Sequence, residues 1–305
     1  MSNDRDTSAP VLAFDVGGTR IKAGLISANT KEEIRQQVVE TPQRIEDVLE
    51  SLRSMGKHLA GDSKVGSCGL CVPGLVSAEG VVTDLPGKLE GIVGRDLPAE
   101  LRSLTDGPIV VVNDAIAYAL GEAVSGAGKG MARAVVMTIG TGIGVTVIDG
   151  QLPLGSGSLG GGILGGMIPI SESTDLVDSG GNPGSIEALC SAQRIVDYSR
   201  SAGGTQGSVE QVYEDFSKGD SSAIGGIDIY RSHLVRALSA IAHAHAPQMI
   251  VLGGGPMTAD NPITPGLEEE LGARLWGGFK VEVRLAELGD SAALWGLAHL
   301  CRKAA

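Results

Sequence analysis

Two similar segments of strand, glycine turn and strand lie far apart in the chain and constrain its fold most strongly. Residues 11–26 have hydrophobic strand patterns on both sides of Asp-Val-Gly-Gly-Thr, and residues 134–148 repeat the arrangement around Gly-Thr-Gly. Glycines between two such patterns are typical of a tight turn that joins antiparallel strands. The repeat predicts an α/β protein with two structurally similar halves that face one another.

Glycine-rich turns at strand ends can also bind phosphate. A third one, Gly-Gly-Gly at residues 253–255, ends the strand predicted at residues 249–252, and an Asn-Asp pair at residues 113–114 follows the strand predicted at residues 109–112. Glycine has no Cβ to keep backbone N–H groups away from an anion. A nearby carboxylate can hold hydrated Mg²⁺ or take a proton from an attacking hydroxyl. Together the motifs predict phosphoryl transfer.

Each motif also has a purely structural explanation. Gly17 and Gly18 could serve only as a hairpin turn, and Asn113 is a natural N-cap whose neighbour Asp114 complements the dipole of the helix that follows. Glu187, near a predicted helix start, could likewise serve the helix dipole alone. The functional interpretation therefore depends on the order and spacing of all the motifs together.

The overall composition narrows the function classes. The chain has 305 residues, of which 42% are hydrophobic and 3% aromatic, and its net charge is −12. This is enough for two lobes with aliphatic cores, and the charge argues against a general binder of nucleic acid or of anionic membranes. The polar N-terminal residues lack the apolar region of a signal peptide, and no apolar run approaches the roughly 20 residues of a membrane span. We expect a cytoplasmic protein without nucleic-acid or membrane partners.

The cysteines raise one further alternative. Cys68 and Cys71 form a Cys-x-x-Cys pattern, which can indicate a metal or redox site. Residues 65–72 read as a strand, however, and residues three apart on a strand face opposite sides. We expect the four cysteines to be reduced, packed as small apolar side chains and free of disulfides. They are Cys68, Cys71, Cys190 and Cys301.

Hydrophobic periodicity places the remaining elements. Further strands are predicted near residues 35–40, 65–72 and 281–285. Helices are predicted for residues 45–59, 113–124, 185–199, 208–218, 223–245, 267–275 and 292–301. Residues 73–98 and 155–184 are rich in glycine and read as long connections; the second has little regular pattern, which is typical of a functional or flexible loop.

The order and spacing of these motifs resemble the ROK family of bacterial sugar kinases, within the actin-like ATPase superfamily. The resemblance covers residues 11–300 and is carried by residues 14–24, 72–74, 84–86, 113–115, 140–144, 253–255 and 289–292. It implies a two-lobed α/β fold of the actin-like ATPase (ribonuclease H-like) type, with a cleft between the lobes. The lobes would be residues 1–114, onto which the C-terminal helix at residues 291–305 packs back, and residues 115–290.

The resemblance also implies a role for each motif. Asp114 would be the general base that takes the proton from a sugar hydroxyl as it attacks the γ-phosphorus of ATP, and Asp15 would organise Mg²⁺ through water. Nucleotide contacts would come from Asp15, Gly17, Gly18, Thr19, Lys22, Gly140, Thr141, Gly142, Gly254 and Gly255. Acceptor contacts would come from Gly74, Asp84, Asn113, Asp114 and Glu187.

Two departures from the family pattern bear on the acceptor and on metal binding. The family's Gly-Glu-x-Gly-His segment reads Gly-Ile-Leu-Gly-Gly at residues 162–166, and its zinc motif has Asp178, Gly180 and Ser185 in place of the three cysteines. We therefore expect no zinc site. The missing Glu and His would have contacted the sugar around its C1 and C2 hydroxyls. The acceptor is expected to differ there, as another sugar, a polyol or a cyclitol would.

Two other functions fit the same motifs. A sugar-sensing regulator or pseudokinase would bind without turnover, but the family's transcriptional members carry an N-terminal helix-turn-helix, and only ten residues precede the first strand here. Polyphosphate could replace ATP as donor, which the acidic balance disfavours. We expect a kinase that uses ATP and Mg²⁺ on a small sugar or sugar-like molecule; homodimers are common in the family.

Overall fold

The computed structural model describes residues 9–27, 33–85, 89–154 and 164–304. The chain is an α/β protein that forms two compact units. Unit 1 consists of Met1–Gly126, Leu152–Gly161 and Asp290–Ala305, and unit 2 of Ala127–Gln151 and Gly162–Gly289.

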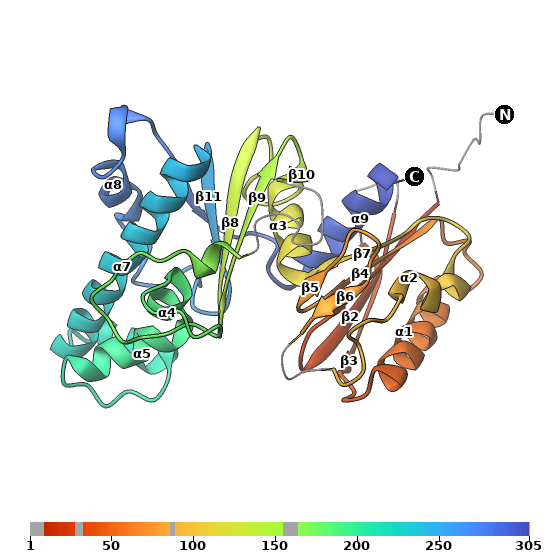
Figure 1. The fold of residues 1–305 in the computed structure, drawn as a ribbon, viewed down its shortest axis with the longest axis horizontal. Coiled ribbons are helices and arrows are strands. Elements are labelled where there is room, and N and C mark those ends of the chain that lie inside the picture. Colours follow the sequence, from red (N-terminus) through yellow and green to blue (C-terminus); the bar gives the residue numbers. More distant parts are fainter. Residues whose placement is uncertain (1–8, 28–32, 86–88, 155–163, 305) are drawn as a thin grey trace. The chain divides into compact units, whose positions relative to one another are not determined.

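A mixed five-stranded sheet forms the centre of unit 1 (Figure 1). Its strands are β3 (Glu33–Glu40), β2 (Arg20–Ile26), β1 (Val11–Val16), β4 (Ser67–Val72) and β7 (Ile109–Asn113), in that order. As predicted for the first glycine turn, β1 pairs antiparallel with β2, whereas β1, β4 and β7 run parallel. The carboxyl ends of β1, β4 and β7 therefore lie together at one end of the sheet.

Helices cover both faces of this sheet. Helix α1 (Ile45–Ala60) buries residues at three- and four-residue spacing against one face, and α9 (Ala292–Ala304) packs on the other. Helix α3 (Asp114–Val124) packs against α9 at Gly121 and Gly296, where an added Cβ would collide with the backbone of the other helix. The second lobe was predicted to begin at residue 115, whereas by its contacts α3 groups with unit 1.

Unit 2 repeats the plan of unit 1. Its strands β9 (Ile143–Asp149), β8 (Arg133–Ile139), β11 (Met249–Gly253) and β12 (Glu282–Leu285) neighbour one another in that order. Strands β8 and β9 form an antiparallel hairpin around the second glycine turn, and β8, β11 and β12 run parallel. The predicted similarity of the two halves is confirmed, because each joins an antiparallel hairpin to parallel strands.

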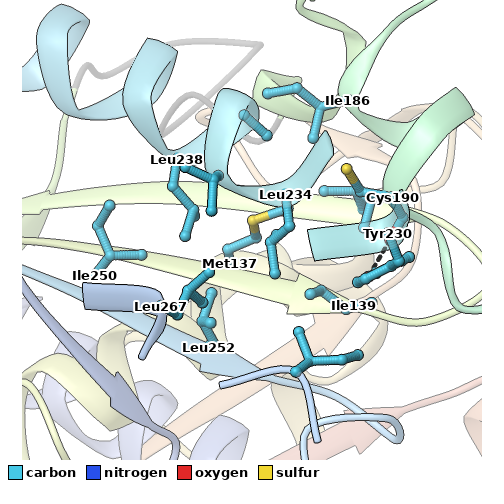
Figure 2. Packing of buried hydrophobic residues seen from close by; sticks show 14 of the residues in the cluster. Met137, Ile139, Ile186, Cys190, Tyr230, Leu234, Leu238, Ile250, Leu252 and Leu267 are labelled. Atoms are coloured by element: carbon cyan, nitrogen blue, oxygen red, sulfur yellow. Dashed lines mark hydrogen bonds between the residues drawn. The ribbon is translucent and has the colours of Figure 1, made fainter. Parts of the chain in front are cut away.

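The core of unit 2 lies between this sheet and its helices. These are α4 (Ile186–Cys190), α5 (Ala192–Ser201), α6 (Val209–Ser217), α7 (Ser221–His245) and α8 (Leu267–Gly272). Figure 2 shows Met137 and Ile139 of β8 among side chains from α4, α7 and β11. Tyr230 is fully buried there, and its hydroxyl donates a hydrogen bond to the Cys190 carbonyl at 2.7 Å. This bond satisfies the one polar group that the ring brings into the core.

The structure differs from the sequence analysis in two segments. Residues 73–98 contain a small antiparallel pair and a short helix: β5 (Leu75–Val76), β6 (Val82–Asp84) and α2 (Leu97–Glu100). The single helix predicted at residues 185–199 is two helices, α4 and α5, separated by Ser191 in an extended conformation. The break occurs where the Ala192 N–H donates to the Gly140 carbonyl instead of to a preceding turn.

The glycine-rich stretch predicted at residues 155–184 falls partly outside the described residues, at 155–163, and a short strand, β10 (Leu152–Pro153), precedes it.

Cys68 and Cys71 face opposite sides of β4, as expected, because Cys68 belongs to the core beneath α1 and Cys71 to the core beneath α9. All four cysteines are buried and free.

Candidate active site

The carboxyl ends of the parallel strands in unit 1 bring together residues from three separate motifs. The strand register pairs Asp15 of β1 with Cys71 of β4, and Val72 of β4 with Asn113 of β7. Asp114 follows directly as the first residue of α3. In open α/β sheets, ligands bind at the carboxyl ends of the parallel strands. The first half of the candidate site is therefore located at this end of the unit 1 sheet.

Asp15 shares a hydrogen bond with a buried thiol. The Cys71 Sγ donates to the Asp15 Oδ1 at 3.3 Å. Burial raises the pKa of Asp15, while the Cys71 hydrogen bond and the Lys22 charge oppose the rise. Burial also raises the pKa of the Cys71 thiol well above its ordinary value, and the charges of Asp15 and Asp114 raise it further. The thiol is thus a neutral donor to Asp15.

Backbone and side-chain hydrogen bonds hold the first glycine turn. The Gly17 N–H donates to the Arg20 carbonyl at 2.9 Å, and the Thr41 hydroxyl donates to the Gly17 carbonyl at 2.7 Å. The Thr41 N–H donates to the Thr19 carbonyl at 3.0 Å. Gly18 and Thr19 remain exposed at the tip. The turn is fixed from behind by Thr41, so its tip is available to an anion.

Lys22, predicted to contact the nucleotide, lies in an ion pair. Its Nζ is 3.0 Å from the Asp290 Oδ2, and only 18% of the Lys22 side chain is exposed. Asp290 lies in the short turn Gly289–Ser291 that leads into α9, and the charges of Lys22 and Asp290 act on Asp15. No role for Asp290 was predicted from the sequence. The two positions are 268 residues apart, and only the return of α9 to the first sheet brings them together.

Asn113 connects the helix start to the Pro-Gly loop. Its Oδ1 accepts from the Ala115 N–H at 2.8 Å, which makes it the N-cap of α3. Its Nδ2 donates to the Gly74 carbonyl at 2.8 Å. Gly74 has a φ of +91° and lies so close to the Asp84 carbonyl that an added Cβ would collide with it. The structural role foreseen for Asn113 is present, and the acceptor residues predicted in unit 1 lie close together.

The second and third glycine turns lie side by side in unit 2. Strands β8 and β11 are parallel and pair Thr138 with Gly253, so both turns follow at the carboxyl ends of their strands. Gly254 has a φ of +102° and lies against the Ile139 carbonyl, where a side chain has no room, whereas Gly255 faces open space. Thr141 and Gly142 are exposed. The nucleotide residues predicted in this unit therefore gather at one end of its sheet.

Glu187 lies behind the second turn. It is only 8% exposed, and its Oε2 accepts from the Ile143 N–H at 3.0 Å while its Oε1 accepts from the Ser179 N–H at 2.9 Å. From the sequence, a helix-dipole role and an acceptor contact are expected for this residue. Its hydrogen bonds to residues 143 and 179 were not predicted, because such three-dimensional contacts leave no local signal.

The residues of unit 1 fit a magnesium ion bound through water. Mg²⁺ in kinases usually keeps several waters and is held by one or two carboxylates together with substrate phosphates. A half-buried carboxylate such as Asp15, whose pKa is raised by burial, is stabilised by a nearby cation. Exposed glycine turns fit phosphate groups. Among the described residues, no three His, Cys, Asp or Glu side chains gather as a ready-made metal site.

The segment that replaces the zinc motif does not fit zinc. The Asp178 Oδ1 accepts from the Gly180 and Asn182 N–H groups, both at 2.9 Å, and Asn182 Nδ2 donates to it at 3.2 Å. Burial raises the pKa of Asp178, but these hydrogen bonds and one from Ser185 outweigh it and hold the pKa below its ordinary value. A single carboxylate already occupied by amide donors is a poor zinc ligand. The absence of zinc stays a prediction.

Two units, each with a hairpin around a glycine turn followed by parallel strands, define an α/β protein with the fold of the actin-like ATPases. Most of the candidate site residues lie at or beside the carboxyl ends of parallel strands, where open α/β sheets bind ligands. The chain belongs to the ROK family, whose family model matches residues 11–304.

Similar proteins share this fold over nearly their whole length. A glucokinase from Thermotoga maritima is 24% identical over 96% of this chain and 97% of its own. An N-acetylgalactosamine kinase from a Shewanella species is 26% identical over 94% and 95%, respectively. The crystal structure of a ROK hexokinase from Thermus thermophilus superimposes with a TM-score of 0.83 at 26% identity, covering 95% of this chain and 96% of its own. None of the described helices has both the length and the apolar character needed to cross a membrane.

Proposed function

We propose that the protein transfers the γ-phosphoryl group of ATP to a hydroxyl of a sugar or sugar-like acceptor, with Asp114 as the general base. One observation carries most weight: Asp15, the buried Cys71 thiol and Asn113, which Asp114 follows directly, lie at the carboxyl ends of three neighbouring parallel strands. The class of enzyme, a carbohydrate kinase, follows from the family and from the relatives named above.

The phosphate side of the proposal rests on Asp15 and the glycine turns. Asp15 would orient a hydrated Mg²⁺, which supplies positive charge to the transferring phosphoryl group when it is bound. The turns at residues 17–19 and 140–142 would donate backbone N–H groups to phosphate oxygens, and residues 254–255 would lie against the adenosine. Lys22 would add charge beside Asp15, from its position in the pair with Asp290.

Asp114 carries the proton transfer in this proposal. Its carboxylate would accept the proton of the acceptor hydroxyl while that oxygen forms a bond to the γ-phosphorus. The bond from the γ-phosphorus to the bridging oxygen breaks at the same time, and ADP leaves. Asp114 is half-buried at the first position of α3, next to an N-cap that fixes the local backbone. A fixed base position favours catalysis because the reacting atoms need little reorganisation.

The acceptor would be held by Gly74, Asp84, Asn113 and Glu187 together with Asp114. Asn113 uses one amide N–H for Gly74, and the Asp84 side chain is exposed beside that loop. A carboxylate such as Glu187 has about four acceptor positions, two of which are occupied by backbone N–H groups. Because residues 162–166 lack the family's Glu and His, we propose an acceptor that differs from glucose around C1 and C2.

The test is ADP release from Mg·ATP across hexoses, amino sugars, ketoses, pentoses, polyols and cyclitols. We expect an acceptor-dependent signal that Asp114→Ala reduces by about two orders of magnitude or more. Asp228→Asn, at an exposed position of α7, serves as the matched control and should keep the activity. Nucleotide binding without turnover on any acceptor would instead favour a sugar-sensing protein, and an Asp114 variant with normal turnover would remove this residue from its role.

A further inference from the structure

We propose that Glu187 is a positioning residue for the nucleotide: its carboxylate fixes the second glycine turn, and residues 178–182 hold that carboxylate in place. The inference rests on the proposed function, since it assigns the turn at residues 140–142 to phosphate binding. It adds to the acceptor contact a second role for Glu187, on the opposite substrate.

The position of the Glu187 carboxylate is set by its own helix. The preceding Ser185 is the N-cap of α4, and its Oγ accepts from the Ala188 N–H at 3.1 Å. Ile186 is fully buried in the core of unit 2, where Figure 2 shows it near Cys190. With a cap on one side and a core residue on the other, the backbone at Glu187 has little freedom.

The carboxylate meets the glycine turn directly. The Ile143 N–H, at the start of β9, donates to Glu187 Oε2 at 3.0 Å. A Cβ added at Gly142 would lie 2.7 Å from the same oxygen, closer than real Cβ contacts come. A side chain at residue 142 would thus have to displace the Glu187 carboxylate from its present position. The contact fixes the end of the turn that leads into β9.

The other end of the turn is held by the same segment of chain. The break between α4 and α5 at Ser191 frees the Ala192 N–H, which donates to the Gly140 carbonyl at 2.8 Å. Within the turn, the Gly140 N–H donates to the Gly142 carbonyl at 3.0 Å. Residues 187–192 therefore clamp both ends of the turn and leave its tip, Thr141 and Gly142, exposed.

Residues 178–182 contact the second oxygen of the Glu187 carboxylate. The Ser179 N–H donates to Glu187 Oε1 at 2.9 Å, and the Asp178 carboxylate closes the loop through the Gly180 and Asn182 N–H groups. These are the positions where the family's zinc motif would lie. Here, hydrogen bonds to two carboxylates give the loop its shape and present Ser179 to Glu187.

The negative charge of Glu187 argues for positioning and against direct phosphate binding. A carboxylate repels phosphate, so its benefit to nucleotide binding must come from the geometry that it imposes on the turn. Both carboxylate oxygens are needed, because each accepts from a different segment. Glutamine supplies only one acceptor oxygen, and aspartate is one methylene shorter, so each of these replacements should release one of the two contacts.

The test measures binding of the Mg²⁺ complex of AMPPNP to the full-length protein by calorimetry, without acceptor. Glu187→Gln and Glu187→Asp should both weaken binding by about tenfold, as expected for the loss of one hydrogen bond to a charged group. Glu172→Gln, at an exposed position of the same unit, is the matched control and should bind like the wild type. Asp178→Asn, which alters the loop and its hydrogen bond with Ser185 but leaves the Glu187 carboxylate in place, should weaken binding by a smaller factor, about threefold.

The outcomes separate this inference from the proposed function. In steady-state kinetics the KM for ATP should rise in both Glu187 variants. Unchanged nucleotide affinity in folded Glu187 variants, with only the acceptor KM raised, would overturn the positioning role and leave the kinase assignment intact. A wild-type protein that binds no nucleotide would overturn both. Thermal melting of each variant identifies a loss of affinity that comes only from unfolding.

Discussion

At the scale of single residues, the candidate site pairs a cysteine thiol, Cys71, with a partly buried carboxylate, Asp15. Asp15 is half-buried, and the Cys71 Sγ is within hydrogen-bonding distance of its Oδ1. The sequence predicts Asp15 as a site residue, but it predicts Cys71 only as core packing. The pairing depends on β1 and β4 being parallel neighbours in one register, which the local sequence does not specify.

The hydrogen bond from Cys71 to Asp15 predicts that replacing the thiol by an apolar group of similar size weakens nucleotide binding. Cys71→Val removes the donor and should weaken binding of Mg·AMPPNP by about three- to tenfold, because Asp15 loses a fixed orientation. Cys71→Ser keeps a donor and should bind nearly as the wild type does. Cys68→Val, on the same strand but in the opposite core, is the control. Calorimetry decides, and equal affinities for the two valine variants would contradict the idea.

The burial of Asp15 predicts that its charge lowers the stability of the folded protein while it supports the binding of Mg²⁺. Burial raises the pKa of Asp15, so its charged form is disfavoured in the folded protein. Asp15→Asn removes that charge with little change of shape and should increase the free energy of unfolding of the ligand-free protein at neutral pH. The same variant should lose its response to Mg²⁺ in nucleotide binding. Urea unfolding in EDTA tests the first part, and a less stable variant would count against it.

At the scale of elements, several short segments differ from what periodicity predicts. The helix at residues 185–199 has continuous helical spacing, yet it breaks at Ser191 because Gly140 accepts the next N–H. Strands β5 and β6 are only two and three residues long, too short for a repeating pattern. Long amphipathic elements such as α1 were predicted well, because their burial repeats many times. The bounds of short helices and strands depend instead on tertiary hydrogen bonds, which periodicity does not reveal.

The loop at residues 178–182 predicts how stability depends on a single carboxylate. Asp178→Ala removes the carboxylate that accepts from the Gly180 and Asn182 N–H groups and should cost about 1–3 kcal/mol in the free energy of unfolding. The folded pKa of Asp178 lies below the ordinary 3.8, so this contribution is fully present above pH 3.8 and is lost as the pH falls through the folded pKa. Urea unfolding measures both effects.

The control for this loop is Asp175→Ala, at an exposed position nearby, which should change stability little. EDTA should leave the melting temperature of the wild-type protein unchanged, because hydrogen bonds in place of a metal hold the loop. A fall in melting temperature that added zinc restores would contradict the expectation of no zinc.

At the scale of the whole molecule, the motif order was sufficient to predict the fold class and the family. Both sheets contain the expected hairpin and parallel strands, and the site residues of each unit gather at the ends of those strands. Contacts that depend on distant segments were not predictable in the same way. The Lys22–Asp290 pair spans 268 positions, and the Glu187 contacts join α4 to residues 143 and 179.

The close packing of α3 against α9 connects Asp114, at the start of α3, to the chain segment that enters α9. The two helices meet backbone to backbone at Gly121 and Gly296, without the layer of side chains that usually separates helices and lets them slide. Asp114 begins one helix, and Asp290 lies two residues before the other. We therefore expect the two helices to move together, so a displacement of the chain entering α9 would be carried to Asp114 at the start of α3.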